Sequence, residues 1–200
     1  MNYDKIYRIS TEYDKIEYGI IYGNEKIVFI KTGASGNIKG YCNKYLKMGY
    51  RIHNSIGATI ICSSNPDVDM DLKIKADKTI INKISVQQRF ENYEMYFIGT
   101  SDGGYYNLLL SYDFPQTIKY LGINSSYIDL EDFVEKIQRL PDFEKIFVYG
   151  EDDESYNSVV QTLNNLECKT LKFISLEGID HGFTGRIDDF ITLADLIVNK

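Results

Sequence analysis

The chain has 200 residues, of which 44% are hydrophobic and 14% aromatic, and its net charge is −7. This length and composition suit one globular domain with a full hydrophobic core, so we expect residues 1–200 to form a single domain. Acidic residues outnumber basic ones, and the basic residues do not cluster with aromatic ones. The sequence therefore argues against a surface that binds the phosphate backbone of nucleic acids.

The first residues mix charged side chains with tyrosine and lack the continuous apolar stretch of a secretory signal. No segment approaches the roughly 20 consecutive apolar residues that span a bilayer. The three cysteines, Cys42, Cys62 and Cys168, are scattered, which favours reduced thiols over a disulfide framework. We therefore predict a cytoplasmic protein with no membrane partner.

The amino-terminal part of the chain predicts two kinds of strand. Residues 3–9 and 12–22 alternate β-prone and polar positions, which predicts an antiparallel hairpin at a sheet edge. Residues 27–30 form a continuous apolar run, which is typical of a parallel strand covered on both faces. After a loop over 31–36, we expect a helix that ends near Gly49 and buries Tyr41, Tyr45, Leu46 and Met48.

The next segments predict a strand over 58–62, a turn over 63–66 and an irregular acidic stretch over 67–76. A helix is expected over 77–92, and its apolar set is Ile80, Ile81, Ile84, Val86 and Phe90.

Strands and helices alternate along the rest of the chain. Strands are expected over 118–123, 146–149 and 171–176, and helices over 129–139, 155–166 and 186–198. Short links between alternating elements predict an α/β fold with a doubly wound, mostly parallel sheet, helices on both faces and the antiparallel hairpin at one edge. Ligands bind such sheets beyond the carboxyl ends of the strands.

The most informative motif is Gly-Thr-Ser-Asp-Gly at residues 99–103. It follows a β-prone run ending at Ile98 and precedes a helical pattern, as in a nucleophile elbow. In that turn Ser101 would occupy a strained conformation, and side chains at Gly99 or Gly103 would collide with the neighbouring backbone. Ser101 is therefore the candidate nucleophile.

A serine hydroxyl needs a base within hydrogen-bond reach, and the chain has two histidines. His181 follows the expected strand over 171–176, where the loops of the candidate site lie. His53 follows the first helix, where a histidine is usually a partly exposed polar residue. We therefore select His181 as the base.

The carboxylate that orients the base has two adjacent candidates, Asp152 and Asp153, which both follow the expected strand over 146–149. Asp180 directly precedes His181 and is better placed to fix the loop than to reach the ring. The residues alone leave the choice between Asp152 and Asp153 open.

From about Lys26 onwards the chain resembles the α/β-hydrolase superfamily. The elbow maps onto Ser101, the acid loop onto residues 150–153 and the histidine loop onto residues 178–183, which read Gly-Ile-Asp-His-Gly-Phe. The resemblance implies that Asp153, three residues after the glycine that ends its strand, is the acid.

The same resemblance places the oxyanion loop at Thr32-Gly33-Ala34. The oxyanion hole would then consist of the backbone amides of Ala34 and Asp102. Thr32 stands where the family usually has a histidine, which weakens this part of the match.

The resemblance implies a serine hydrolase that cleaves a carboxylic ester or thioester through an acyl-enzyme, with a small-molecule acyl substrate. Two alternatives remain open: acyl transfer or deacylation of a sugar or glycopeptide, and a binding protein that kept the fold without turnover. No cofactor is expected. Two distant histidines and scattered cysteines give no metal-ligand spacing, so no metal is expected either. The short link after residues 118–123 predicts an open pocket without a lid.

Overall fold

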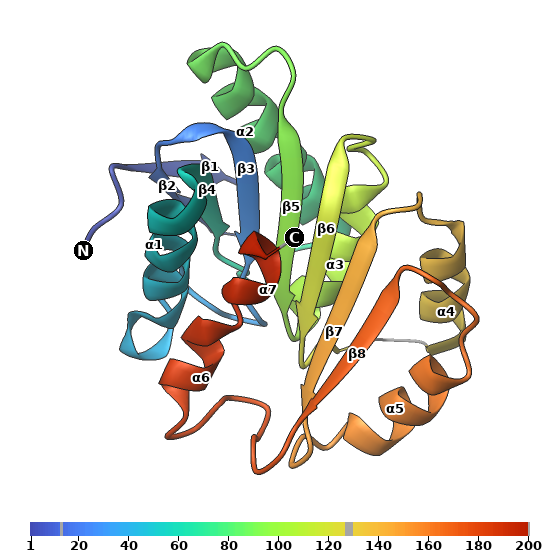
Figure 1. Ribbon diagram of the computed structural model, residues 1–200. Helices are drawn as coiled ribbons and strands as arrows, with labels where there is room; N and C mark the ends of the chain where they lie inside the picture. Colours follow the sequence, from blue (N-terminus) through green and yellow to red (C-terminus); the bar gives the residue numbers. More distant parts are fainter. Residues whose placement is uncertain (13, 127–129, 200) are drawn as a thin grey trace.

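The computed structural model describes residues 1–12, 14–126 and 130–199. Within these residues the strands form one eight-stranded sheet in the order β1-β2-β4-β3-β5-β6-β7-β8 (Figure 1). β1 pairs with β2 and β2 with β4 antiparallel, and all other neighbours are parallel. The strands are β1 (Lys5–Ser10), β2 (Lys15–Ile21), β3 (Asn24–Lys31), β4 (Ala58–Ser63), β5 (Glu94–Thr100), β6 (Thr117–Ile123), β7 (Glu144–Gly150) and β8 (Leu171–Leu176).

Helices cover both faces of the sheet (Figure 1). One layer contains α1 (Lys44–Ile56), α6 (Ile187–Thr192) and α7 (Asp195–Val198). The short 3₁₀ helix η1 (Tyr41–Asn43) directly precedes α1. The other contains α2 (Met70–Gln88), α3 (Asp102–Ser111), α4 (Leu130–Arg139) and α5 (Tyr156–Asn164). The predicted fold class, including the hairpin at the edge, is confirmed. Of the predicted segments, residue 13 of the hairpin and Asp129 at the start of a helix lie outside the described residues.

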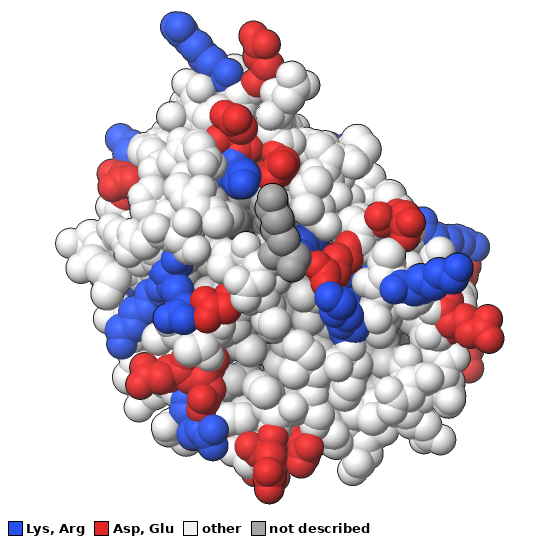
Figure 2. Space-filling view, in the orientation of Figure 1, with Lys and Arg blue, Asp and Glu red and all other residues white. Residues whose placement is uncertain are grey.

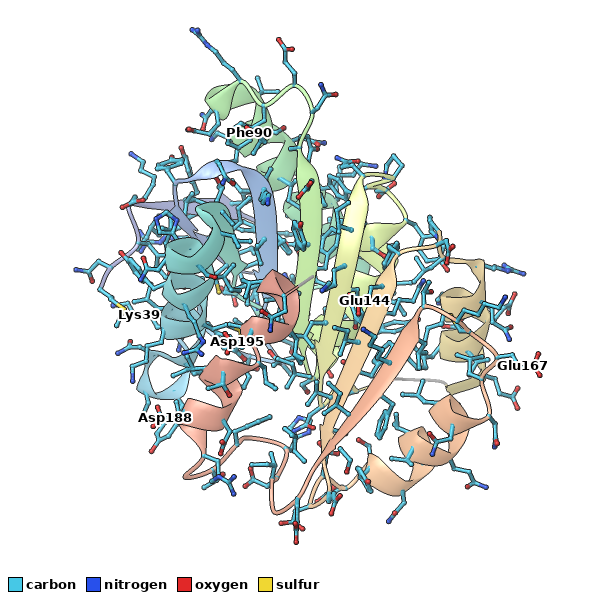
Figure 3. The ribbon with its side chains drawn as sticks, viewed as in Figure 1. Lys39, Phe90, Glu144, Glu167, Asp188 and Asp195 are labelled. Carbon is cyan, nitrogen blue, oxygen red and sulfur yellow. The ribbon has the colours of Figure 1, made fainter. Side chains whose placement is uncertain are left out.

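The continuous apolar strands supply both cores. Phe29, Phe97 and Phe147 face the layer of α2 to α5, whereas their neighbours Val28 and Ile98 face the layer of α1, α6 and α7. Successive side chains of a strand point to opposite faces, so a strand that is covered on both sides is apolar at most of its positions. An ion pair between Arg51 of α1 and Asp195 of α7, with Nε and Oδ1 2.7 Å apart, joins two helices of the second layer. Figure 3 labels Asp195 where α7 lies beside α1.

The first helix differs from its prediction at both ends. α1 continues through Gly49 to Ile56 and ends at Gly57, which has a φ of 70°. Gly49 is instead a point of close packing, because a Cβ there would lie 3.0 Å from Cγ2 of Ile60. Tyr41, predicted to be buried, precedes α1 and is 71% exposed.

The second helix begins earlier than predicted. α2 starts at Met70, so part of the stretch over 67–76 is helical and not irregular. The carboxylate of Asp69 accepts hydrogen bonds from the amides of Asp71 and Leu72, which satisfies donors that a helix start leaves free. Val86, assigned to the apolar face, is 76% exposed.

The carboxyl-terminal helix predicted over 186–198 is two short helices, α6 and α7. The amides of Leu193 and Ala194 bond to carbonyls three residues back, which tightens the chain between the helices. No helix within the described ranges is long and apolar enough to cross a membrane.

A buried ion pair lies beneath the carboxyl end of β3. Nζ of Lys31 is 2.8 Å from Oδ2 of Asp77 on α2, and both side chains are almost fully buried. Lys31 also donates to the hydroxyl of Ser63, and Oδ1 of Asp77 accepts from Tyr18 at 2.9 Å. Burial, and secondly the Asp77 carboxylate, raise the pKa of Tyr18, which keeps its hydroxyl a donor. This network fastens α2 to the sheet next to the loop that follows β3.

We expect Asp77→Asn to lower the free energy of unfolding by about 3 to 5 kcal/mol, because it leaves the Lys31 ammonium buried without its counter-charge. Urea denaturation measures this change. Lys78→Ala is the control, because it removes only an exposed ion pair with Asp113 and should cost about 0 to 1 kcal/mol. Equal stabilities of the two variants would contradict the prediction.

Candidate active site

Ser101 lies at the turn between β5 and α3, with φ 52° and ψ −130°. A positive φ strains the backbone of a non-glycine residue, and such strain is typical of turns at functional sites. A Cβ at Gly99 would lie 2.4 Å from the carbonyl oxygen of Gly103, and one at Gly103 would lie 2.4 Å from that of Thr32. Both glycines of the motif are therefore required by close backbone approach.

A third glycine, which the sequence analysis missed, packs in the same way. A Cβ at Gly104 would lie 2.0 Å from the hydroxyl oxygen of Ser125, in the loop after β6. The two consecutive glycines, Gly103 and Gly104, at the start of an expected helix could have indicated this close packing.

The structure brings Ser101, His181 and Asp153 together from three separate loops. Nε2 of His181 is 3.0 Å from Oγ of Ser101, and Nδ1 is 2.6 Å from Oδ2 of Asp153. The carboxylate is almost fully buried, whereas the imidazole side chain is 49% exposed. One ring nitrogen can therefore hold its proton against the carboxylate while the other accepts the serine proton.

Asp153, and not Asp152, reaches the imidazole. Its second oxygen, Oδ1, accepts from the amide and the hydroxyl of Ser155 at 2.8 Å and 2.6 Å. Asp152 is exposed, and its amide donates to the carbonyl oxygen of Ile179. The acid loop is thereby joined to the chain that leads to His181.

Asp180 fixes the histidine loop, as the sequence indicated. Its Oδ1 accepts from the amide of Thr184 at 2.8 Å. Hydrogen bonds from Thr184 lower the pKa of Asp180, so the carboxylate stays ionised in this role.

Asn124 connects the acid loop to the histidine loop, and the sequence analysis did not select it. Its Nδ2 donates to the carbonyl oxygens of Asp180 and His181, both at 3.1 Å, and its Oδ1 accepts from the amide of Gly150 at 2.8 Å. Asn124 is almost fully buried and has a φ of 42°. A polar residue directly after the buried strand over 118–123 was the signal that could have found it.

Ser126 is a second residue that the sequence analysis missed. Its Oγ lies 3.1 Å from Oγ of Ser101, so the Ser101 hydroxyl lies between a second hydroxyl and the imidazole. Nothing in the local sequence distinguishes it from an ordinary loop serine.

The loop after β3 lies against Ser101. A Cβ at Gly33 would be 3.1 Å from that of Ser101, and the Gly36 amide donates to the carbonyl of Gly33 at 2.9 Å. Thr32, which replaces the usual histidine, is buried and donates to the carbonyl of Gly36 at 3.1 Å. Ala34 lies within this turn.

Asp102 is the first residue of α3, where helix amides have no partner within the helix. Its carboxylate attracts the ammonium of Lys73 on α2, whose side chain is buried. The Lys73 ammonium lies 4.9 Å from the ring centroid of Tyr106. Burial lowers the pKa of Lys73, whereas Asp102 is one of the carboxylates that raise it. A cation thus partly offsets the charge that Asp102 places near the serine turn.

Two cavities flank the histidine loop. One, of about 420 Å³, is lined by His181 and Ser126 and by the carboxylates of Asp152, Glu154 and Asp180. The other, of about 490 Å³, lies between residues 35–37, the start of α1 and the histidine loop. Gly182 borders both cavities.

The remaining histidine and the cysteines are not part of the site formed by Ser101, His181 and Asp153. Nδ1 of His53 is 2.9 Å from the carbonyl oxygen of Ala58, the first residue of β4, at the opposite end of the strands from Ser101. The three cysteines are free thiols. Among the residues that the structure describes, no cluster of three His, Cys, Asp or Glu side chains could hold a metal ion.

Comparison with solved structures identifies the fold. An α/β serine hydrolase homologue from Coxiella burnetii aligns with a TM-score of 0.73 at 14% identity, covering 100% of this chain and 99% of the other. Est1E from Butyrivibrio proteoclasticus aligns with a TM-score of 0.71 at 14% identity, covering 96% of each chain. The chain has the α/β-hydrolase fold. No protein-family model and no curated protein matches the sequence.

An α/β serine hydrolase without a lid, from Xanthomonas campestris, also aligns, with a TM-score of 0.66 at 14% identity and coverage of 96% of this chain and 92% of the other. In the present α/β-hydrolase fold the link from β6 to α4 spans residues 124–129, of which 124–126 are described. This link is too short for an inserted lid domain.

We expect Asn124→Ala to lower the free energy of unfolding by about 2 to 3 kcal/mol, because three hydrogen bonds are lost and the buried amide of Gly150 is left without its acceptor. Amide hydrogen exchange at residues 178–184 should become faster. Urea denaturation and exchange measured by NMR test both effects. Asn82→Ala on the exposed face of α2 is the control, with a change within about 0.5 kcal/mol. Unchanged exchange in the histidine loop would contradict the role assigned to Asn124.

Proposed function

We propose that the protein is a serine hydrolase that cleaves carboxylic esters or thioesters through an acyl-enzyme. The observation that carries the proposal is the continuous hydrogen-bonded series from Ser101 through His181 to Asp153. A strained turn that presents a serine, a base within reach and a buried carboxylate behind the base are the parts that acyl transfer chemistry requires.

In the proposed first step, Oγ of Ser101 attacks the substrate carbonyl while Nε2 of His181 takes its proton. The tetrahedral intermediate collapses, His181 donates that proton to the leaving alcohol or thiol, and Ser101 keeps the acyl group. Water then attacks the acyl-enzyme with His181 again as base, which releases the acid and restores the serine. Asp153 holds the proton on Nδ1 and stabilises the imidazolium throughout.

The negative oxygen of the intermediate needs convergent donors. We assign this role to the backbone amides of Ala34 and Asp102. The contact of Gly33 with Ser101 and the position of Asp102 at the first turn of α3 support the assignment. A helix start also favours developing negative charge.

We expect a fluorophosphonate probe to label the protein at Ser101, with the modified peptide identified by mass spectrometry. Ser101→Ala should abolish labelling and lower kcat for an activated ester by about 10⁴-fold or more. A folded protein that ignores the probe and cleaves no ester would support the non-catalytic binding alternative. Transfer of the acyl group to an added alcohol in preference to water would support acyl transfer.

The variants Asp153→Asn and Asp152→Asn together test which aspartate orients His181. Asp153→Asn should lower kcat by about 10³- to 10⁴-fold, because the imidazole loses the carboxylate that fixes its tautomer. Asp152→Asn should leave kcat within about twofold, because the ring is hydrogen-bonded to Asp153 and not to Asp152. Comparable losses in the two variants would contradict the assignment.

We also expect the protein to prefer esters with a short acyl chain. Without an inserted lid, a long acyl chain would remain in water and gain no burial, so kcat/KM for p-nitrophenyl esters should fall from butanoate to dodecanoate. Initial rates below the micelle-forming concentration of each ester test this. A rise in kcat/KM along the series would contradict the open pocket.

A further inference from the structure

Lys44 is the charged residue of the cavity on the oxyanion-loop side. This cavity of about 490 Å³ has polar walls from Ser35, Asn37 and Thr184 and aromatic walls from Tyr41 and Tyr45. Lys44, the first residue of α1, also lines it. The cavity therefore combines one ammonium with neutral polar and aromatic groups.

The Lys44 ammonium has no carboxylate partner among the described residues, since none lies within 4.0 Å of its Nζ. It donates to the carbonyl oxygen of Gly182 at 3.3 Å and lies 4.5 Å from the ring centroid of Phe190. The two arginines on this side of the molecule are paired, Arg51 with Asp195 and Arg186 with Asp189. Figure 2 shows basic side chains gathered over α1 and acidic ones over α6. Lys44 is thus a cation with donor capacity to spare.

The surroundings of Lys44 favour an anion. Burial lowers its pKa, and the carboxylate of Asp180 opposes this only in part. A partly desolvated ammonium gains from a negative group placed beside it, because the attraction is stronger where water is excluded. A ligand carboxylate entering the cavity would supply that charge.

The other cavity fixes which part of a substrate would face Lys44. His181 lines the acidic cavity and must donate a proton to the leaving group, so the leaving group belongs on that side. The acyl group would then extend away from that cavity, and the neighbouring cavity, which also borders Gly182, holds residues 35–37 and Lys44. The carboxylates of Asp152, Glu154 and Asp180 would repel an anionic leaving group.

We propose that the preferred substrates are esters or thioesters of short dicarboxylic acids, bound with the free carboxylate of the acyl group on the Lys44 ammonium. This proposal rests on the proposed serine hydrolase function and names its substrate class. The single cation of this cavity distinguishes an anionic acyl group from a neutral one of the same length. Lys44 is the specificity-determining residue.

The experiment compares two activated esters of equal chain length, the p-nitrophenyl half-ester of glutaric acid and p-nitrophenyl pentanoate. The measured quantity is the ratio of their kcat/KM values in each variant. Lys44→Met should lower the ratio by about 10- to 100-fold, the size expected for a charge-assisted hydrogen bond. Lys44→Glu should lower it further, because it places a negative charge opposite the substrate carboxylate.

Lys47→Met is the matched control. It removes the same charge from α1 one turn further on, but Lys47 lines a different cavity, with Cys42 and Asp188. The ratio in this variant should stay within about twofold of wild type, because Lys47 does not line the cavity that contains Lys44. An unchanged ratio in Lys44→Met, or equal losses for both esters, would overturn the proposal and leave Lys44 as a residue that only positions Gly182.

Binding to the Ser101→Ala variant separates this proposal from the proposed function. Calorimetry should show the glutarate half-ester binding to Ser101→Ala and binding about tenfold or more weakly to Ser101→Ala/Lys44→Met. If wild type cleaves neither ester and resists the fluorophosphonate while this difference in affinity persists, the hydrolase function fails and the carboxylate site stands. If wild type cleaves pentanoate but the affinities are equal, the carboxylate site fails and the hydrolase function stands.

Discussion

Backbones from three segments meet without intervening side chains where β5 turns into α3. Gly99 lies against the backbone of Gly103, and Gly103 lies against the carbonyls of Lys31 and Thr32. No Cβ fits at either glycine, so the end of β3, the end of β5 and the start of α3 form one rigid corner. The strained Ser101 and the two amides assigned to the oxyanion keep their relative positions because of this packing. The acid and the histidine are then brought to that corner from β7 and β8.

The charged side chains around the histidine loop form regions of opposite charge. The buried pair of Lys31 and Asp77 is internally neutralised and fastens α2 beneath the loop after β3. Above it, one cavity carries several carboxylates and the other carries Lys44. A substrate that spans both would be held in one direction only, since reversing it would place like charges together. Orientation then follows from charge as well as from shape.

The sequence was sufficient where one local pattern determined one local structure. Ser101, Asp153 and His181 each follow a strand, and parallel strands bring their carboxyl ends to one edge, so their meeting could be predicted. Helix limits were less predictable: Gly49 suggested an end but serves close packing against Ile60, and the acidic stretch before residue 77 hid a start capped by Asp69. Asn124, Ser126 and the partners of Lys31 depend on contacts between distant segments, which no local pattern encodes.

The hydrogen bonds of Asn124 determine how the proposed activity would be lost on heating. Its single amide group spans the acid loop and the histidine loop, so neither can drift away while the other stays in place. We therefore expect the two loops, at the β6 to β8 side of the sheet, to open together. Heating would therefore disable acid and base in a single event, and inactivation would follow a sharp transition in place of a gradual decline.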